Sequence, residues 1–287
     1  MKKKKGILST IILVLVILVG LSVMLYPIVS SWWNSEVQSK LVAQYDEQIS
    51  KIDESRFEEF FNNAYEYNRQ LANIHSPLTE YDKVKGYDDT LDVTGTGIMG
   101  YVTIPQINVE LPIYHGTSEG VLNIAVGHLQ GSSLPVGGLG THAVISAHRG
   151  LPSATLFSDL DNMAIGDVFT VTVLNEVLSY KVDEINVVLP YEMEKLAIDK
   201  NNDYVTLMTC TPYGVNSHRL LVRGVRIPNE EAEKILRVSA DAQKVDNMIV
   251  MPFMAFPLFL ILVFVWAFGG KKKTRTEFDY DLEFNDK

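Results

Sequence analysis

Val168-Phe169-Thr170-Val171-Thr172-Val173 alternates apolar and polar side chains, the pattern of a β-strand with one buried face. Asn175-Glu176 can turn the chain, and the residues from Val177 to Val182 are again rich in β-branched and aromatic types. The stretch therefore predicts a β-hairpin. It sets the fold class because segments of the same character recur on both sides of it.

Seven short segments between residues 97 and 228 read as strands, separated by Gly, Pro and Asn. Many short strands with few helices predict a mainly β domain, either a sandwich or a small barrel. The expected strands are Ile98–Ile104, Val109–Tyr114, Thr141–Ala147, Val168–Leu174, Leu178–Val188, Tyr204–Thr209 and Arg219–Ile227.

The region before the β domain has two parts. Residues 30–71 lack Gly and Pro from Glu36 onward and carry apolar residues near helical spacing, which predicts one or two amphipathic helices. Residues 72–96 are polar, show no periodicity and form a long loop of the kind that is often functional or disordered. After the β domain, Asn229 is a candidate helix cap for residues 230–245 within a linker spanning residues 229–247.

Two apolar segments lie near the ends of the chain. Residues 7–29 and 248–268 are each long enough to cross a bilayer, and lysines flank the outer end of each, at residues 1–6 and 269–287. The positive-inside rule predicts a two-span membrane protein with both termini in the cytoplasm and the β domain outside. Trp32 and Trp33 suit the membrane interface. The alternative for residues 7–29 is a cleaved signal peptide.

Composition narrows the function classes. The net charge of the 287 residues is −10 although both ends are lysine-rich, so the exported domain is acidic and unsuited to binding nucleic acid. The single cysteine, Cys210, excludes an intrachain disulfide and a multi-cysteine metal site. Nothing in the sequence indicates a metal or organic cofactor. On composition alone a lone cysteine is more often a buried core residue than a functional thiol.

The surroundings of Cys210 reverse that expectation. In Thr206-Leu207-Met208-Thr209-Cys210-Thr211-Pro212-Tyr213-Gly214, the cysteine ends an apolar strand and a turn follows. A hairpin would bring Arg219 back beside it, and a guanidinium stabilises a thiolate and donates hydrogen bonds to an oxyanion.

A histidine also ends a predicted strand, in Val144-Ile145-Ser146-Ala147-His148-Arg149-Gly150-Leu151-Pro152. Nucleophilic cysteine chemistry needs a group that manages the proton on the leaving amine, and histidine is the usual one. His148 mirrors the position of Cys210, but five other histidines compete for the role: His75, His115, His128, His142 and His218.

These motifs together resemble those of the sortases. The resemblance rests on Thr-Leu-Met-Thr-Cys with arginine nine residues later, on Ala-His-Arg-Gly-Leu-Pro, and on the strand motifs from Gly100 and Leu111. It covers residues 97–228 and implies a closed barrel of about eight strands. It further implies that Cys210 is the nucleophile, His148 the general acid/base and Arg219 the oxyanion or substrate stabiliser. It also suggests substrate contacts for Thr209, Leu151 and Pro152, although Thr209 could be a plain strand residue.

Two features are similar to the class C, pilin-polymerising sortases: the second apolar segment with its basic tail, and the long loop before the barrel. That class carries a lid with an Asp-Pro-aromatic motif, which is missing here. The nearest triplet is Ser76-Pro77-Leu78. No lid role is therefore assigned to these residues from the sequence.

The resemblance implies a cysteine transpeptidase that cleaves an LPXTG-like sorting signal on a pilin and joins it to a lysine of the next pilin. Its expected partners are pilins at a Gram-positive cell surface. Three alternatives stay open: an enzyme that anchors proteins to a peptidoglycan amine, a peptidase that hydrolyses the signal, and a non-catalytic pilin-binding scaffold.

Overall fold

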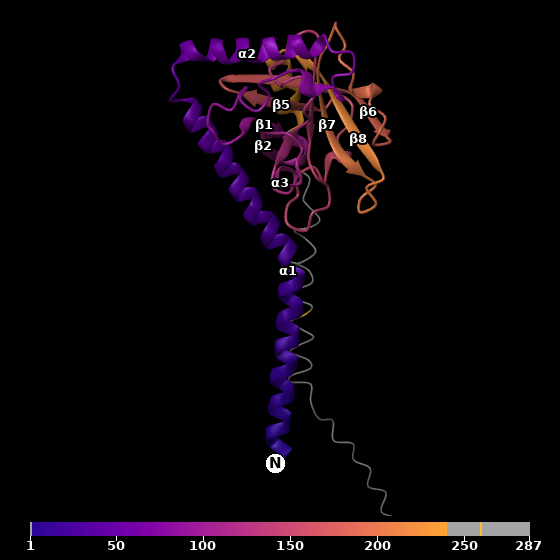
Figure 1. Cartoon of the computed structure of the whole chain (residues 1–287). Coiled ribbons are helices and arrows are strands. Elements are labelled where there is room, and N and C mark those ends of the chain that lie inside the picture. The colour runs from indigo at the N-terminus through magenta and orange to yellow at the C-terminus, as the bar shows by residue number, and fades with distance from the viewer. Residues whose placement is uncertain (1, 240–258, 260–287) are drawn as a thin grey trace, which may run out of the picture. The chain divides into compact units, whose positions relative to one another are not determined.

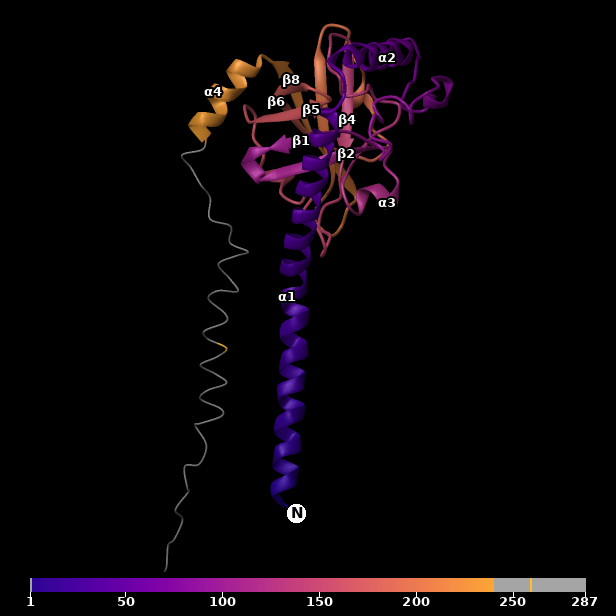
Figure 2. The same cartoon turned by 90° about the vertical axis from the view of Figure 1, so that its left-hand side faces the viewer.

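The computed structural model describes residues 2–239 and residue 259, with side-chain surroundings from residue 12 to residue 236. Eight strands form a closed barrel in the order β1-β2-β3-β4-β7-β8-β6-β5 (Figures 1 and 2). This confirms the predicted mainly β fold and the barrel. The strands are β1 (Ile98–Ile104), β2 (Val109–His115), β3 (Val126–His128), β4 (Thr141–Ser146), β5 (Val168–Val173), β6 (Glu176–Val188), β7 (Asp203–Thr211) and β8 (His218–Ile227).

All seven predicted strands are present, with ends shifted by two residues at most. The strand that the sequence analysis did not predict is β3, which is three residues long and too short to show a periodicity. It pairs in parallel with β2 and antiparallel with β4 and so closes the sheet between them.

Two of the barrel's pairings are parallel. β4 and β7 run side by side from Thr141↔Asp203 to Ser146↔Met208, while β7 and β8 form an antiparallel hairpin. Because parallel strands end at the same edge of a sheet, the C-terminal ends of β4 and β7 lie together, with the start of β8 beside them.

The N-terminal region forms two helices, α1 (Lys2–Ile49) and α2 (Glu54–Ala72). α1 continues without a break from the apolar segment to the barrel, and Asp53 caps α2 by accepting a hydrogen bond from Ser55 N–H. Figures 1 and 2 show α2 across one end of the barrel, while α1 runs along the barrel wall and continues past the opposite end.

Three short 3₁₀ turns and a one-turn helix lie in the barrel connections, and a fourth 3₁₀ turn precedes the barrel. They are η1 (Tyr81–Lys83), η2 (Pro105–Ile107), α3 (Glu119–Leu122), η3 (Leu160–Asn162) and η4 (Glu194–Leu196). α4 (Asn229–Ser239) starts at Asn229 itself and packs Ala232 against Val168 and Ile227. The expected span 248–268 and its tail lie outside the described residues.

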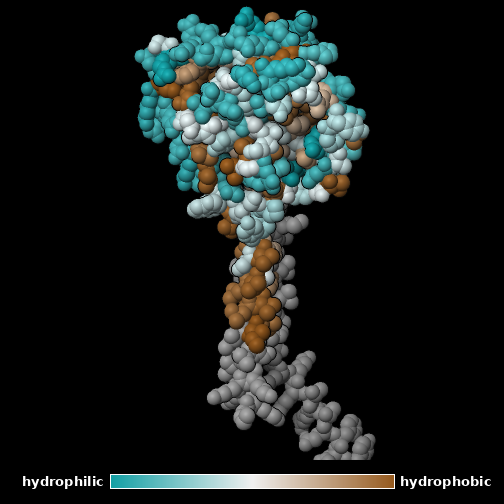
Figure 3. Space-filling model, viewed as in Figure 1, coloured by the Kyte–Doolittle hydropathy of each residue, from teal (hydrophilic) through white to brown (hydrophobic). Residues whose placement is uncertain are grey.

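Among the described residues, one helix is long and apolar enough to cross a membrane, Ile12–Ile49. Its apolar side chains from Ile12 to Trp33 are mostly exposed, as the brown surface of Figure 3 shows. Past this stretch, Val42, Tyr45 and Ile49 are buried against the barrel. The helix therefore has an apolar half free of the barrel and a half that packs on it.

Residues 72–96 differ from the loose loop that their composition indicates. Val84, Tyr87 and Leu91 are buried in the main core, and the Tyr87 hydroxyl lies 2.9 Å from His128 Nδ1 and accepts from Gly116 N–H. The second half of the segment is thus anchored to the barrel.

Tyr45 links α1 to the barrel. Its buried hydroxyl donates to Met99 O at 3.2 Å and accepts from Leu174 N–H at 2.9 Å. Tyr45→Phe leaves both backbone groups unpaired, so the free energy of unfolding should fall by about 1–3 kcal/mol. Urea unfolding in detergent, followed by near-ultraviolet circular dichroism, measures this. Tyr65→Phe, at an exposed tyrosine, is the matched control, and an equal loss in both variants would contradict the assignment.

Two buried histidines predict how stability depends on pH. Burial lowers the pKa of His128 and of His142 to about 4, against about 6.5 in an unfolded chain. Between these values the unfolded chain binds more protons, so the free energy of unfolding should decrease as pH falls from about 6.5 to 4. His142→Gln should flatten this slope, by at most about 1.4 kcal/mol per pH unit. The exposed His75→Gln should leave the slope unchanged, and an unaltered slope in His142→Gln would refute the prediction.

Candidate active site at the ends of strands β4 and β7

The register of three neighbouring strands places Cys210, His148 and Arg219 side by side. Cys210 is the direct partner of Arg219 in the β7–β8 hairpin. On the other side, Ser146 pairs with Met208, and Ala147 N–H donates to Met208 O at 3.2 Å. Continuing this register by two residues brings His148 level with Cys210. The cysteine thus lies on the central strand, with the histidine on one side and the arginine on the other.

The three side chains also share a face of the sheet. In β4, Ala143, Ile145 and Ala147 point into the barrel core, so the alternate residues up to His148 point outward. In β7 and β8, Leu207 and Leu220 belong to the same core. Cys210 and Arg219 are therefore on the outer face with His148. All three are partly exposed, in contrast to the core residues around them.

Arg219 is held by its own loop. Its Nη1 donates to Asn216 O at 3.2 Å and to His218 O at 3.0 Å, which fixes the guanidinium beside the end of β7. Neither Nε nor Nη2 donates to another described residue. These N–H groups are therefore free to donate to an oxyanion formed beside Cys210.

The β7–β8 loop packs against the loop that carries His148. The Arg149 guanidinium lies 5.7 Å from the Tyr213 ring centroid and forms an ion pair with Asp161. Gly150, with φ of +77°, leaves room for the Tyr213 ring, because a Cβ there would lie 2.9 Å from it. Phe157 N–H donates to His148 O at 3.2 Å and closes the loop. These contacts hold the His148 loop and the Cys210 hairpin together.

The competing histidines have other surroundings. His128 and His142 are buried, and His142 lies 2.7 Å from Thr206 Oγ1. His115 lies between Gly97 O and Thr90 O, at 3.0 and 2.8 Å. His75 is exposed and lies in the segment that precedes the barrel. His218 Nδ1 lies 2.9 Å from Ser217 Oγ, and His218 pairs with Thr211, one position beyond the Cys210–Arg219 pair. Of the six, His148 is the one that the register brings level with Cys210.

The other expected substrate contacts do not all reach this face. Thr209 is 1 % exposed and its Oγ1 donates to Ala147 O at 2.9 Å, so its side chain ties β7 to β4 and points away from Cys210. Leu151 packs partly on the main core, whereas Pro152 is exposed. Both lie in the His148 loop, which a bridge between Leu151 and Ala154 tightens.

An apolar groove continues from this site along the outer face of the sheet. Val144, Met208, Leu221 and Val188 come from four neighbouring strands, and Leu196 and Leu129 pack on them. Beside Arg219 the groove forms a cavity of about 170 Å³. This surface cannot be predicted from the sequence, because its residues alternate with those of the barrel core and the strands are apolar on both faces.

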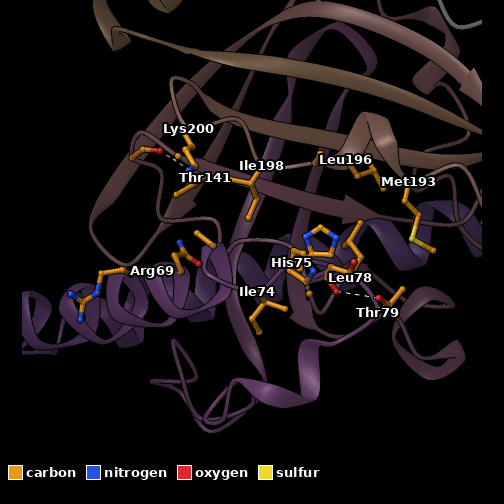
Figure 4. Close-up of a pocket in the computed structure, with 18 of the residues that line it drawn as sticks. Arg69, Ile74, His75, Leu78, Thr79, Thr141, Met193, Leu196, Ile198 and Lys200 are labelled. Atoms are coloured by element: carbon orange, nitrogen blue, oxygen red, sulfur yellow. Dashed lines mark hydrogen bonds between the residues drawn. The ribbon is translucent and has the colours of Figure 1, made fainter.

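Leu78 fills part of the groove. It packs on the same apolar cluster and lines both the small cavity beside Arg219 and a larger one of about 950 Å³. The larger cavity extends past His75 and Thr141 to Lys200 (Figure 4). Met193 and Leu196 also line both cavities. Leu78 therefore lies between the small cavity beside Arg219 and the larger one.

Among the described residues, the hydrogen bonds of residues 75–79 stay within the segment. Thr79 N–H and Glu80 N–H both donate to Ser76 O, and so does the Thr79 hydroxyl. Its contacts with the barrel are packing contacts: a Cβ on Gly131 would lie 2.6 Å from Pro77 O. The segment is thus held over the groove by apolar packing of Leu78 and by shape.

No group of three or more His, Cys, Asp or Glu side chains able to hold a metal ion occurs among the described residues. The chemistry available from the chain itself is that of a thiol, an imidazole and a guanidinium on one face. This combination suits acyl transfer through a thioester.

Comparisons with known proteins point to one family. The family model described as the Sortase domain matches residues 102–227. Sortase C1 of Streptococcus agalactiae is 49 % identical, with a TM-score of 0.61 over 66 % of this chain and 99 % of that one. Streptococcus pneumoniae sortase C, whose structure is described in terms of pilin substrate specificity, is 48 % identical, with a TM-score of 0.59 over 66 % and 97 %. A lid mutant of S. agalactiae sortase C1 is 43 % identical, with a TM-score of 0.59 over 65 % and 97 %.

The match to sortase C1 covers 99 % of that chain at 49 % identity, and the residues matched by the family model include Cys210. The chain therefore belongs to the sortase family and to its class C, and it is a cysteine transpeptidase.

Proposed function

We propose that this enzyme polymerises pilins, with Cys210, His148 and Arg219 as its catalytic residues. The observation that carries the proposal is the register that sets these three side chains level on one outer face, at the end of an apolar groove. The similarity to sortases C1 and C of streptococci supports the choice of pilins as substrates.

The proposed reaction has two acyl transfers. The Cys210 thiolate attacks the threonine carbonyl of an LPXTG-like signal, and Arg219 donates hydrogen bonds to the oxyanion. The C–N bond then breaks, His148 protonates the leaving amine, and a thioester remains on Cys210. A lysine amine of the next pilin attacks the thioester and gives its proton to His148. The new amide forms and the Cys210 thiolate is released beside the protonated His148, which restores the starting state without consuming a nucleotide.

The groove next to Arg219 fits an extended apolar peptide. Its floor of Met208, Leu221 and Val188 presents aliphatic side chains that suit the leucine and proline of such a signal. Leu151 and Pro152 are proposed contacts on the opposite side, in the His148 loop. Thr209 is proposed as a residue that positions β7 against β4 through its hydroxyl.

We further propose that α1 is an uncleaved membrane anchor, with residues 248–268 as a second span. The exposed apolar side chains from Ile12 to Trp33 have no partner in the described part of the chain, which supports burial in lipid. The barrel then lies outside the cell, where pilins are assembled. The anchoring of proteins to peptidoglycan is the second candidate function, and it differs only in the acceptor amine.

The polymerisation proposal predicts a covalent ladder. Co-expression of wild-type enzyme with candidate pilins should give high-molecular-weight species that persist in denaturing gels, and Cys210→Ala should abolish them. Pilins found only as wall-linked monomers would instead favour peptidoglycan anchoring. The absence of a peptide adduct on Cys210 by mass spectrometry, even after deletion of residues 74–80, would exclude a catalytic role for it.

The role of Arg219 has its own test. Arg219→Gln removes the proposed oxyanion donor and should lower the rate of thioester formation by about 10² to 10³. Arg226→Gln is the matched control, because Arg226 lies on the same strand but pairs with Tyr180 far from Cys210. Rapid-quench mass spectrometry of the acyl-enzyme measures both. A similar, small loss in the two variants would argue against the assignment.

Leu78 is proposed to keep the groove closed in the free enzyme. Leu78→Ser removes a partly buried apolar contact of about 1–2 kcal/mol and should accelerate labelling of Cys210 by a thiol reagent by about 5- to 30-fold. Leu139→Ser, at an exposed leucine of the β3–β4 connection, should not change the rate. Since Cys210 is the only thiol, labelling reports on this site alone. Equal labelling rates in all three proteins would show that residues 76–79 do not cover it.

A further inference from the structure

α1 is tied to the loop that follows His148 at the point where its apolar run ends. Asn34 Nδ2 donates to Ser153 O at 2.5 Å, and Ser30 Oγ donates to the same oxygen at 3.3 Å. Ser31 Oγ and Thr155 Oγ1 are 2.7 Å apart. These contacts involve the helical turn that carries Trp32 and Trp33, whose side chains are exposed. The His148 loop is therefore level with the last turn of the proposed membrane helix.

The contacts between α1 and the barrel begin within one helical turn of Asn34. Gln38, one turn further along α1, donates to Ile124 O at 2.8 Å. Tyr45 is already buried, with hydrogen bonds to Met99 of β1 and to Leu174, which follows β5. At 1.5 Å per residue, the contact at Asn34 and the end of the apolar run at Val29 are only about 8 Å apart along the helix. No spacer separates the barrel from the proposed bilayer.

The end of the barrel that faces this level carries exposed apolar side chains. Tyr213 and Val215, at the tip of the β7–β8 loop, are 62 % and 69 % exposed. The Tyr213 ring packs over Gly150, and Gly150 is three residues, or at most about 10 Å of chain, from Ser153. Ile124, beside Gln38, is also exposed. Aromatic and aliphatic side chains at this height suit the interface between headgroups and acyl chains.

We infer that the catalytic end of the barrel lies against the lipid surface, with Tyr213 and Val215 in contact with the interface. This inference rests on the proposed anchoring of α1. The occupant is a bilayer because the patch continues the apolar surface of α1 past Trp32 and Trp33. The contact is assigned to the apolar side chains of Tyr213 and Val215, so we expect it to form without anionic lipid. Cys210 is three residues before Tyr213 in the chain, so the catalytic site would then lie close to the membrane surface.

Site-directed fluorescence tests this in the full chain. In a Cys210→Ala background, a single cysteine is introduced by Val215→Cys, Leu139→Cys or Trp33→Cys and labelled with an environment-sensitive fluorophore. Leu139 is the matched control, because it is 79 % exposed but precedes β4, at the end of that strand opposite to His148. Each protein is placed in phosphatidylcholine nanodiscs with or without a nitroxide-labelled lipid.

We expect the nitroxide lipid to reduce the fluorescence at positions 33 and 215 and not at position 139. Quenching at 33 with none at 215 would overturn this inference and leave the anchoring intact. Absence of quenching at 33 would overturn both, because α1 would not lie in the bilayer. Equal quenching at 139 and 215 would also overturn it, since the barrel would then have no preferred face. The fluorescence measurement does not depend on activity. Its outcome therefore does not test the roles proposed for Cys210, His148 and Arg219.

Discussion

The parallel pairing of β4 with β7 is the constraint on which the site depends. It sets Ser146 opposite Met208, and the next two residues of each strand bring His148 and Cys210 level. The Thr209 hydroxyl reinforces the pairing by donating to Ala147 O between them. A shift of one residue would turn one of the two side chains into the barrel core. The hairpin with β8 then adds Arg219 on the other side of the cysteine without any further adjustment.

The same alternation that builds the core also builds the groove. Leu207, Val222 and Ile145 fill the barrel, while their neighbours Met208, Leu221 and Val144 form an apolar outer surface. Near the site, these strands therefore carry apolar side chains on both faces. This also explains why a segment as short as residues 76–79 can rest there by packing alone, with its hydrogen bonds satisfied internally.

Local signals in the sequence predict the strands and the Cys210–Arg219 hairpin, because both depend on alternation and on turns between near neighbours. The pairing of β4 with β7 joins residues about sixty positions apart. The strand-end position of His148 favours it among six histidines, but the resemblance to a family is needed to select it. β3 is too short for a period. Tyr87 and Leu91 anchor a polar segment through isolated contacts that no pattern reveals, and Thr209 shows that a residue next to the nucleophile can point the other way.

The unbroken course of α1 has a consequence for how the enzyme meets its substrates. A single helix of 48 residues joins the apolar run to the barrel, and the barrel packs on its last turns. With α1 spanning a bilayer as proposed, the domain cannot swing on a flexible tether. Its remaining freedom is lateral diffusion and rotation about the membrane normal, so its search is confined to two dimensions. Encounter rates would then follow the surface density of pilin precursors and not their concentration in the surrounding fluid.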